Sequence, residues 1–392
     1  MRILHSIHSA NPKGGGPIEG LKQLAALNTM VGHSVEVVTL DSPDSPWLKD
    51  FPIPIHATGP SYLGYGYTPR FVPWLREHHR DYDVVIVNGI WQYASFGTWR
   101  ALADTSTPYC VFTHGMLDPW FKKQYPLKHL KKWLYWPWGD YRVLRDALAV
   151  LFTTEEERRL ARRSFWLFRC DEVVISYGIR APNGDESSQR EVFLSAFPHL
   201  RGKRLLLFLG RVHEKKGCEL LIEAFARLLR ANASGAAPLH LVFGGPFEGD
   251  YGDSLKAMIS RAGIEAHVTW TGMLAGDLKW GAFYSAEAFV LPSHQENFGI
   301  AIAEALACGV PVLISNRVNI WREIKLHNAG LVESDDLAGT ERLLKTWDAL
   351  PAETKSRMRL NARSCFMRCF NIDSNATAFI DTLRLLGVPR DR

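Results

Sequence analysis

Short apolar segments alternate with helical patterns along most of this chain. In the first half, apolar runs occupy residues 3–7, 34–40, 84–87, 109–113 and 147–152. Between the first two runs, apolar residues recur at helical spacing from Leu21 to Val31, and Pro17 suits a first helical turn. Continuous apolar strands that alternate with helices are typical of a parallel sheet with helices on both faces.

The same alternation restarts in the second half, where we expect strands at residues 205–209, 239–243, 267–270, 288–291 and 310–314. Residues 181–203 are polar and rich in turn formers, which indicates a linker. We therefore predict an α/β protein with two doubly wound, Rossmann-like domains that face each other across a cleft. The expected domains are residues 1–181 and 182–370, followed by a C-terminal helix within 371–392 that returns to the N-terminal domain.

Length and composition narrow the possible classes. A chain of 392 residues fits two domains, and its net charge of +5 is well below that of a dedicated nucleic-acid binder. No run approaches the ~20 apolar residues of a membrane-spanning helix, and the first residues are too few and too polar for a signal peptide. The six cysteines are scattered without a CxxC pattern, so we expect no disulfide framework, no zinc site and a reduced cytoplasm.

A basic loop follows the strand predicted at 205–209. Gly210 permits a tight exit from the strand, and Arg211 and Lys216 can converge on one anion. The helix that follows would add its N-terminal amides. From these residues alone, a phosphate site and a solvated basic turn are equally good interpretations.

A second motif follows the strand predicted at 288–291. Glu296 lies in the loop, and Glu304 lies eight residues later, in a helix that starts near Phe298. Eight helical residues rise ~12 Å, which does not suit the carboxylate pair ~5 Å apart of a double-displacement glycosidase. Such carboxylates would instead accept hydrogen bonds from different hydroxyls of one elongated ligand. The alternative is that Glu304 is a solvated helix residue, but its neighbours are small or apolar.

Together, the two motifs resemble the retaining nucleotide-sugar glycosyltransferases of family 4, which have the GT-B fold. The resemblance covers most of the chain and is densest over residues 205–331. It implies that Arg211 and Lys216 bind the donor diphosphate, that Glu296 binds donor sugar hydroxyls and that Glu304 binds the ribose. It also assigns the following residues to the donor site: Gly244, Met273, Leu274, Asn297, Phe298 and Gly299.

The first half carries weaker signals. Three consecutive glycines, Gly14, Gly15 and Gly16, follow the first strand, and the backbone there could approach a phosphate or a sugar closely. The resemblance implies that this loop contacts the donor or the acceptor. His114 follows the strand at 109–113, and the resemblance implies a position beside the anomeric centre, although a single histidine is more often structural. Asp118 and Trp120 are candidate acceptor contacts.

The resemblance also implies a mechanism. No second carboxylate is placed as a nucleophile, so the acceptor hydroxyl would attack from the face that the diphosphate leaves, and the leaving phosphate would take the proton. The catalytic candidates are Arg211, Lys216, Glu296 and His114. The sequence Asp81-Tyr82-Asp83 precedes a strand, at the end of the sheet away from bound ligands, so we expect no metal and no cofactor beyond the nucleotide-sugar substrate.

Residues 120–138 combine seven aromatic residues with five lysines and no acidic residue. Lysines beside interfacial aromatic rings suit contact with an anionic membrane surface. Packing of these rings in the core, with the lysines solvating a helix, is an equally good interpretation. Although basic and aromatic residues together could suggest RNA, we find no nucleic-acid motif and expect no such partner.

The sequence therefore predicts a retaining hexosyltransferase with a UDP-sugar donor, UDP-glucose being favoured over GDP-mannose. We expect the acceptor to be a glycan or lipid-linked glycan in polysaccharide biosynthesis, and the protein to be cytoplasmic and peripheral on the inner membrane leaflet. Two alternatives are a non-catalytic nucleotide-sugar-binding or membrane scaffold protein and a GT-B-like UDP-sugar epimerase, whose catalytic acids we do not find.

Overall fold

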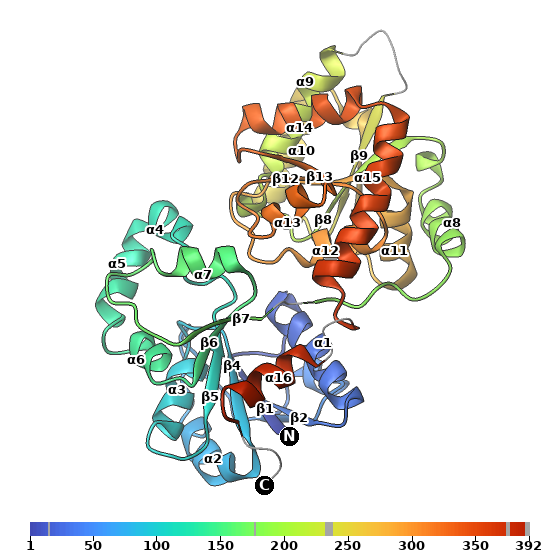
Figure 1. The fold of residues 1–392 in the computed structure, drawn as a ribbon. Helices are drawn as coiled ribbons and strands as arrows, with labels where there is room; N and C mark the ends of the chain where they lie inside the picture. Colours follow the sequence, from blue (N-terminus) through green and yellow to red (C-terminus); the bar gives the residue numbers. More distant parts are fainter. Residues whose placement is uncertain (15, 176–177, 232–237, 374–376, 389–392) are drawn as a thin grey trace. The chain divides into compact units, whose positions relative to one another are not determined.

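The computed structural model describes residues 1–14, 16–175, 178–231, 238–373 and 377–388. The chain divides into two compact units, Met1–Gly178 with Ile372–Arg392, and Ile179–Asn371. Each unit contains one parallel sheet with helices packed around it (Figure 1).

The first unit contains a sheet of strand order β3-β2-β1-β4-β5-β6-β7. β4 and β5 are buried throughout, as expected for continuous apolar strands in a covered parallel sheet. The C-terminal helix α16 lies beside this sheet (Figure 1). Its Phe379 ring stacks on Phe112 of β5, with the two ring centroids 6.4 Å apart. The strands are β1 (Arg2–Ile7), β2 (Ser34–Thr39), β3 (Ile55–Ala57), β4 (Val84–Asn88), β5 (Tyr109–Phe112), β6 (Ala149–Phe152) and β7 (Glu172–Val174). The α-helices are α1 (Gly16–Met30), α2 (Phe71–His78), α3 (Tyr93–Leu102), α4 (Trp120–Gln124), α5 (Pro126–Tyr135), α6 (Asp140–Arg145), α7 (Glu155–Ala161) and α16 (Ala378–Leu385).

The second unit contains a sheet of strand order β10-β9-β8-β11-β12-β13. Its chain ends with a π-helical turn at Phe366–Phe370 that follows α15 directly. The strands are β8 (Arg204–Leu209), β9 (Leu239–Gly244), β10 (Val268–Gly272), β11 (Ala286–Leu291), β12 (Val312–Ser315) and β13 (Gly330–Glu333). The α-helices are α8 (Glu186–Ala196), α9 (Cys218–Ala231), α10 (Asp250–Ala262), α11 (Gly276–Ser285), α12 (Ile300–Ala307), α13 (Trp321–Leu326), α14 (Leu337–Ala349) and α15 (Ala352–Cys365).

Each sheet has one point where the strand order reverses. In the first unit it lies between β1 and β4, and in the second unit it lies between β8 and β11. Ligands of open α/β sheets bind beyond the carboxyl ends of the strands at such a point. In the second unit, the two motif loops follow β8 and β11, so the topology alone brings them to the same place.

The structure confirms the two parallel α/β sheets and corrects the sequence prediction in two respects. The polar stretch 181–203 is not a simple linker, because α8 occupies Glu186–Ala196 and packs against α11. Its N-cap is Asp185, whose carboxylate accepts a hydrogen bond from Ser188 N at 2.7 Å. In addition, β3, β7 and β13 were not predicted, because these short edge strands are only partly buried and lack long apolar runs.

Candidate functional site

Glycines join the loops at the carboxyl ends of β8, β9 and β10. Gly210 N donates a hydrogen bond to Gly244 O at 2.9 Å, and Gly245 N donates one to Gly272 O at 2.7 Å. A Cβ atom on Gly245 would lie 2.0 Å from Gly210 O, and the φ of Gly245 is +129°. Only glycine fits there without a backbone shift, so the loops form one closely packed edge.

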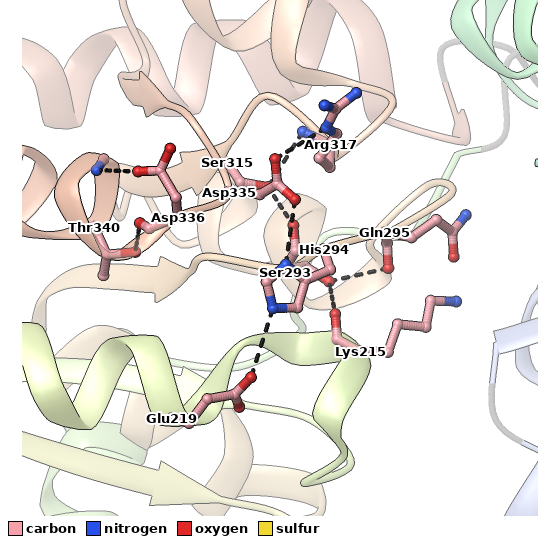
Figure 2. A network of polar contacts seen from close by, with 11 residues as sticks. Lys215, Glu219, Ser293, His294, Gln295, Ser315, Arg317, Asp335, Asp336 and Thr340 are labelled. Carbon is pink, nitrogen blue, oxygen red and sulfur yellow. Dashed lines mark hydrogen bonds and ion pairs between the residues drawn. The ribbon is translucent and has the colours of Figure 1, made fainter. Parts of the chain in front are cut away.

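Backbone contacts also join the two motif loops. Gly217 has a φ of +65°, and a Cβ atom on it would lie 2.3 Å from the carbonyl oxygen of Pro292. The carbonyl oxygen of Lys215 accepts hydrogen bonds from Ser293 Oγ at 2.8 Å and from His294 N at 2.9 Å (Figure 2). The loop after β8 and the loop after β11 are thus fixed to each other.

His294 anchors this junction through two carboxylates. Its Nδ1 lies 3.2 Å from Asp335 Oδ2, and its Nε2 lies 3.5 Å from Glu219 Oε1 (Figure 2). Hydrogen bonds to Asp335 and Glu219 raise the pKa of His294 to about 9, so the imidazolium form dominates at neutral pH. His294, together with Arg317, lowers the pKa of Asp335 to about 2. His294 was not among the predicted site residues, although it follows a strand and precedes the Glu296 motif.

Lys216 and Glu296 form a direct ion pair at the centre of this arrangement. Lys216 Nζ donates to Glu296 Oε2, and the side chains are 19% and 15% exposed. Burial alone would raise the pKa of Glu296, but the charges of Lys216 and Lys215 and the Asn297 amide lower it. Glu296 is therefore an ionised, partly desolvated carboxylate. Its main chain is fixed because Glu296 N donates to Arg317 O at 3.1 Å and Glu296 O accepts from Asn319 N at 3.0 Å.

The three residues after Glu296 connect the loop to the protein core. Asn297 Oδ1 accepts a hydrogen bond from Asn319 Nδ2 at 3.1 Å. Phe298 is buried, and its ring meets Phe370 edge to face at 5.7 Å. Gly299 has a φ of +73° and is the N-cap of α12, so the helix begins two residues later than predicted. At the start of α12, Ile302 N and Ala303 N donate hydrogen bonds to Gly299 O at 2.8 and 3.2 Å, which fixes the turn to the helix.

Glu304 is buried and makes an ion pair that was not predicted. Its Oε1 lies 2.7 Å from Lys279 Nζ of α11, and the two side chains are 9% and 24% exposed. A buried carboxylate between small, apolar neighbours needs a partner, and Lys279 provides it. Lys279 belongs to a helix without a recognisable motif, so no sequence signal pointed to it.

The remaining predicted donor residues of this unit line the strand ends. Arg211 is exposed, and among the described residues no carboxylate lies within ion-pair distance of it. Gly244 is the last residue of β9. In the loop after β10, Met273 is 72% exposed, whereas Leu274 is buried, and its Cδ1 would lie 3.3 Å from a Cβ atom placed on Gly244.

In the first unit, His114 lies at the end of β5 in a strained turn. Its φ is +48°, its ring stacks on Phe112 at 5.5 Å, and burial lowers its pKa to about 4. Its Nε2 lies 3.3 Å from Asn88 Oδ1. The Nδ2 of Asn88 donates to the Ile86 carbonyl at 3.1 Å, which orients the amide oxygen toward His114. His114 is therefore neutral at physiological pH, and its ring is held in place by Asn88 and Phe112.

A buried carboxylate fixes the His114 turn. Glu157 Oε1 accepts from Thr113 Oγ1 at 2.7 Å and from Gly115 N at 2.5 Å, on both sides of His114. Glu157 Oε2 accepts from Thr153 N at 2.8 Å and from Thr153 Oγ1 at 2.7 Å. Glu157 was not predicted because it belongs to the charged run of α7, a pattern typical of a solvated helix face.

The other candidates of the first unit have local roles in the structure. Gly14 ends a short 3-10 turn, and Gly16 begins α1, while Gly15 lies outside the described residues. Asp118 Oδ1 accepts a hydrogen bond from Trp120 N at 2.8 Å, and the Trp120 ring packs against neighbouring aromatic rings. In the Asp81-Tyr82-Asp83 sequence, Asp83 accepts a hydrogen bond from Arg2 N at 2.7 Å.

The aromatic segment divides between core and surface. Trp136 is fully buried, and its Nε1 donates to Leu167 O at 2.5 Å. Lys132 is half-buried, with its Nζ 4.4 Å from the Trp91 ring centroid. Six large apolar side chains of α5 and its surroundings are exposed, and we call them the α5 patch: Leu127, Leu130, Trp133, Leu134, Trp138 and Trp166. Within the described ranges, no helix is both long and apolar enough to cross a bilayer.

Comparisons with known proteins cover both units. A model described as glycosyl transferases group 1 matches residues 190–364, and one described as glycosyl transferase 4-like domain matches residues 15–178. An uncharacterised glycosyltransferase of Methanocaldococcus jannaschii is 34% identical over 151 residues, and this match covers 37% of this chain and only 37% of that relative.

Two solved structures are similar over nearly the whole chain. Sucrose-phosphate synthase from Thermosynechococcus elongatus has a TM-score of 0.79 at 20% identity, covering 98% of this chain and 99% of that one. Anabaena HepE, in complex with UDP-glucose, has a TM-score of 0.78 at 18% identity, covering 98% and 100%. At these identities the similarity shows a shared fold.

Proposed function

Because the chain belongs to the family 4 glycosyltransferases and has the GT-B fold, we propose that it is a retaining hexosyltransferase with a UDP-sugar donor. UDP-glucose is our preferred donor, and GDP-mannose is the main rival. The observation that carries this proposal is the Lys216–Glu296 pair at the strand-order reversal of the second unit. The complex of HepE with UDP-glucose supports the choice of donor.

The Lys216–Glu296 pair has the chemistry to exchange partners when a donor binds. The diphosphate would attract Lys216, and the Glu296 carboxylate would then accept hydrogen bonds from the sugar hydroxyls. Because both side chains are largely shielded from water, these interactions are stronger than they would be on the surface. Arg211, which is exposed at the same loop, adds a second cation for the phosphates.

The Lys279–Glu304 pair has the same chemistry for the other end of the donor. A ribose has vicinal hydroxyls, and the ionised Glu304 side chain, held by Lys279 at 2.7 Å, can accept hydrogen bonds from them. The Lys279 ammonium group would remain beside this carboxylate as its counter-ion while the ligand excludes water.

We assign His114 a positioning role at the sugar. A pKa of about 4 makes it neutral at physiological pH, so it does not serve as a cationic acid. As a neutral imidazole held beside Asn88 at the end of β5, His114 suits hydrogen bonding to a sugar hydroxyl rather than a charge interaction. In the front-face mechanism that we propose, the acceptor hydroxyl forms the new glycosidic bond as the bond to the diphosphate breaks. The acceptor proton passes to the leaving phosphate, whose charge Lys216 and Arg211 stabilise, so that no metal is required.

We further propose that the acceptor is a glycan on a lipid carrier and that the α5 patch contacts an anionic membrane surface. The patch combines exposed Trp133, Trp138 and Trp166 with nearby lysines, a composition that suits the interfacial region of a bilayer. Beside Trp166 lies a pocket of about 430 Å³ lined by Arg162, Phe165, Trp166, Phe168, Arg169, Cys170 and Glu172.

Vesicle sedimentation tests the membrane contact. The Leu130→Ser/Leu134→Ser variant should lose binding to phosphatidylglycerol vesicles at low salt, because it removes apolar area without touching buried residues. Leu360→Ser, at a 73% exposed leucine of the second unit, is the matched control. Equal sedimentation of the wild type and the double variant, or no binding by either, would refute the membrane proposal.

Donor turnover tests the transferase proposal. Labelled UDP- and GDP-sugars are incubated with the full chain, and slow nucleotide release is measured. Release should be greatest with UDP-glucose and should fall strongly in Glu296→Ala but not in Glu353→Ala, an 85% exposed glutamate of the same unit. Absence of release from every donor, with unchanged donor binding in Glu296→Ala, would favour the non-catalytic scaffold. Release of an epimerised sugar would favour the epimerase.

A further inference from the structure

Three potential metal ligands come together in the second unit, near the end of α15. They are His327, just after α13, Cys365, the last residue of α15, and Cys369 in the π-helical turn. One ligand atom from each side chain lies within 4.8 Å of the other two. Because the residues come from separate helices, the scattered cysteine spacing gave no sign of the cluster.

The separation of Cys369 and His327 suits a tetrahedral ion. With Zn–S and Zn–N bonds of about 2.3 and 2.0 Å, the S···N separation in a tetrahedral site is about 3.5 Å. The Sγ of Cys369 lies 3.5 Å from the Nε2 of His327. Thiolates and imidazole are the ligands that zinc prefers in structural sites.

The backbone around the cluster is unusual. Cys365 and Cys369 are four residues apart, and the chain between them forms a π-helical turn. Such turns are rare and frequently occur at functional sites. The helix α13, which ends just before His327, approaches the same place, since Cys365 Sγ lies 3.9 Å from the Glu323 carbonyl oxygen.

We propose that His327, Cys365 and Cys369 bind one Zn²⁺ ion, with water or the Glu323 carboxylate as the fourth ligand. The ion takes the two sulfurs as thiolates, and their protons pass to solvent, with no change of oxidation state. The three ligands fix the end of α13 to the end of α15. The site is structural and does not take part in glycosyl transfer.

The position of the cluster gives the ion a defined effect. Phe370 follows Cys369 directly, and its ring supports Phe298 of the Glu296 loop at 5.7 Å. The carbonyl oxygen of Phe370 accepts a hydrogen bond from Ile179 N at 2.8 Å. A bound ion would therefore stabilise the turn that supports both the donor loop and the end of the second unit.

Cobalt substitution tests the site in the full chain. The protein is reduced, stripped with a chelator, freed of it and titrated with Co²⁺. One equivalent should produce thiolate-to-cobalt charge-transfer absorption and the intense visible bands of tetrahedral coordination, and Zn²⁺ should displace both. Cys365→Ser/Cys369→Ser should abolish these bands, and His327→Ala should weaken binding. Cys170→Ser, at a partly buried cysteine of the first unit, is the control.

Thermal denaturation gives a second measurement. Zn²⁺ at ~100 times its dissociation constant should raise the melting temperature of the wild type by about 5 °C, with no shift in the double variant. Absence of charge-transfer bands in the wild type would overturn the proposal even if the variants do not fold, and so would bands that survive in the double variant. Donor turnover is measured separately, so neither proposal stands or falls with the other.

Discussion

The junction at His294 leads to a quantitative prediction about pH. Its contacts with Asp335 and Glu219 raise the pKa of His294 from 6.5 to about 9. A raised pKa means that this contribution to stability is fully present below about pH 6.5 and is lost as the pH rises through about 9. From this shift, the contribution of His294 to the free energy of unfolding is about 3 kcal/mol at about pH 6 and about 0.4 kcal/mol at about pH 9. Because the Glu219 side chain is 37% exposed, solvent screens this ion pair, and we halve both contributions, to about 1.5 kcal/mol at about pH 6 and about 0.2 kcal/mol at about pH 9.

His294→Gln isolates this contribution, because glutamine keeps a hydrogen-bonding side chain but cannot become charged. The melting temperature of the full chain is measured by tryptophan fluorescence between about pH 6 and about pH 9. The stabilisation of the wild type over the variant should be about 1.3 kcal/mol larger at the acidic end, which raises the difference in melting temperature by about 3–5 °C. His199→Gln, at an exposed histidine that contacts Thr269, is the control. A difference between wild type and variant that does not change with pH would refute the argument.

Three further substitutions test other parts of the account. Glu157→Ala should lower the free energy of unfolding by about 2–4 kcal/mol and reduce donor turnover, because the buried hydrogen-bond donors of the His114 turn lose their acceptor. Thermal unfolding measures the first effect, and an unchanged stability and turnover would contradict the role of Glu157. Gly245→Ala should destabilise the protein by about 2 kcal/mol or more in the same assay, whereas Gly64→Ala, which meets no atom within 4 Å, should have little effect; equal effects would be the contrary result. Glu304→Ala should weaken the binding of UDP and uridine by similar factors of about 10 in calorimetry, since both carry the ribose, and a loss confined to UDP would count against the ribose assignment.

The central strands of each unit could be predicted because strands buried on both faces of a parallel sheet consist of consecutive apolar residues. The edge strand β13, at Gly330–Glu333, lacks such a run and was missed. The helix α8 was hidden for a related reason, since its buried face consists of only a few residues, including Phe193, within a polar segment. Local patterns therefore revealed the centre of each sheet better than its margins.

The candidate site was predictable where its residues form a compact motif. Lys216 and Glu296 belong to loops whose spacing carries the family resemblance, and the structure pairs them. Lys279, His294 and Glu157 act through contacts between separate elements, and such pairings leave no periodic signal in one sequence.

The Lys216–Glu296 pair is best tested by titration calorimetry of UDP and uridine with Lys216→Ala. Because Lys216 would contact the diphosphate, the variant should bind UDP about 10–100 times more weakly and uridine as well as the wild type does. Lys345→Ala, at an exposed lysine paired with Glu341 on α14, should leave both affinities unchanged. An equal loss for UDP and uridine, or no loss for UDP, would contradict the assignment of Lys216 to the donor diphosphate.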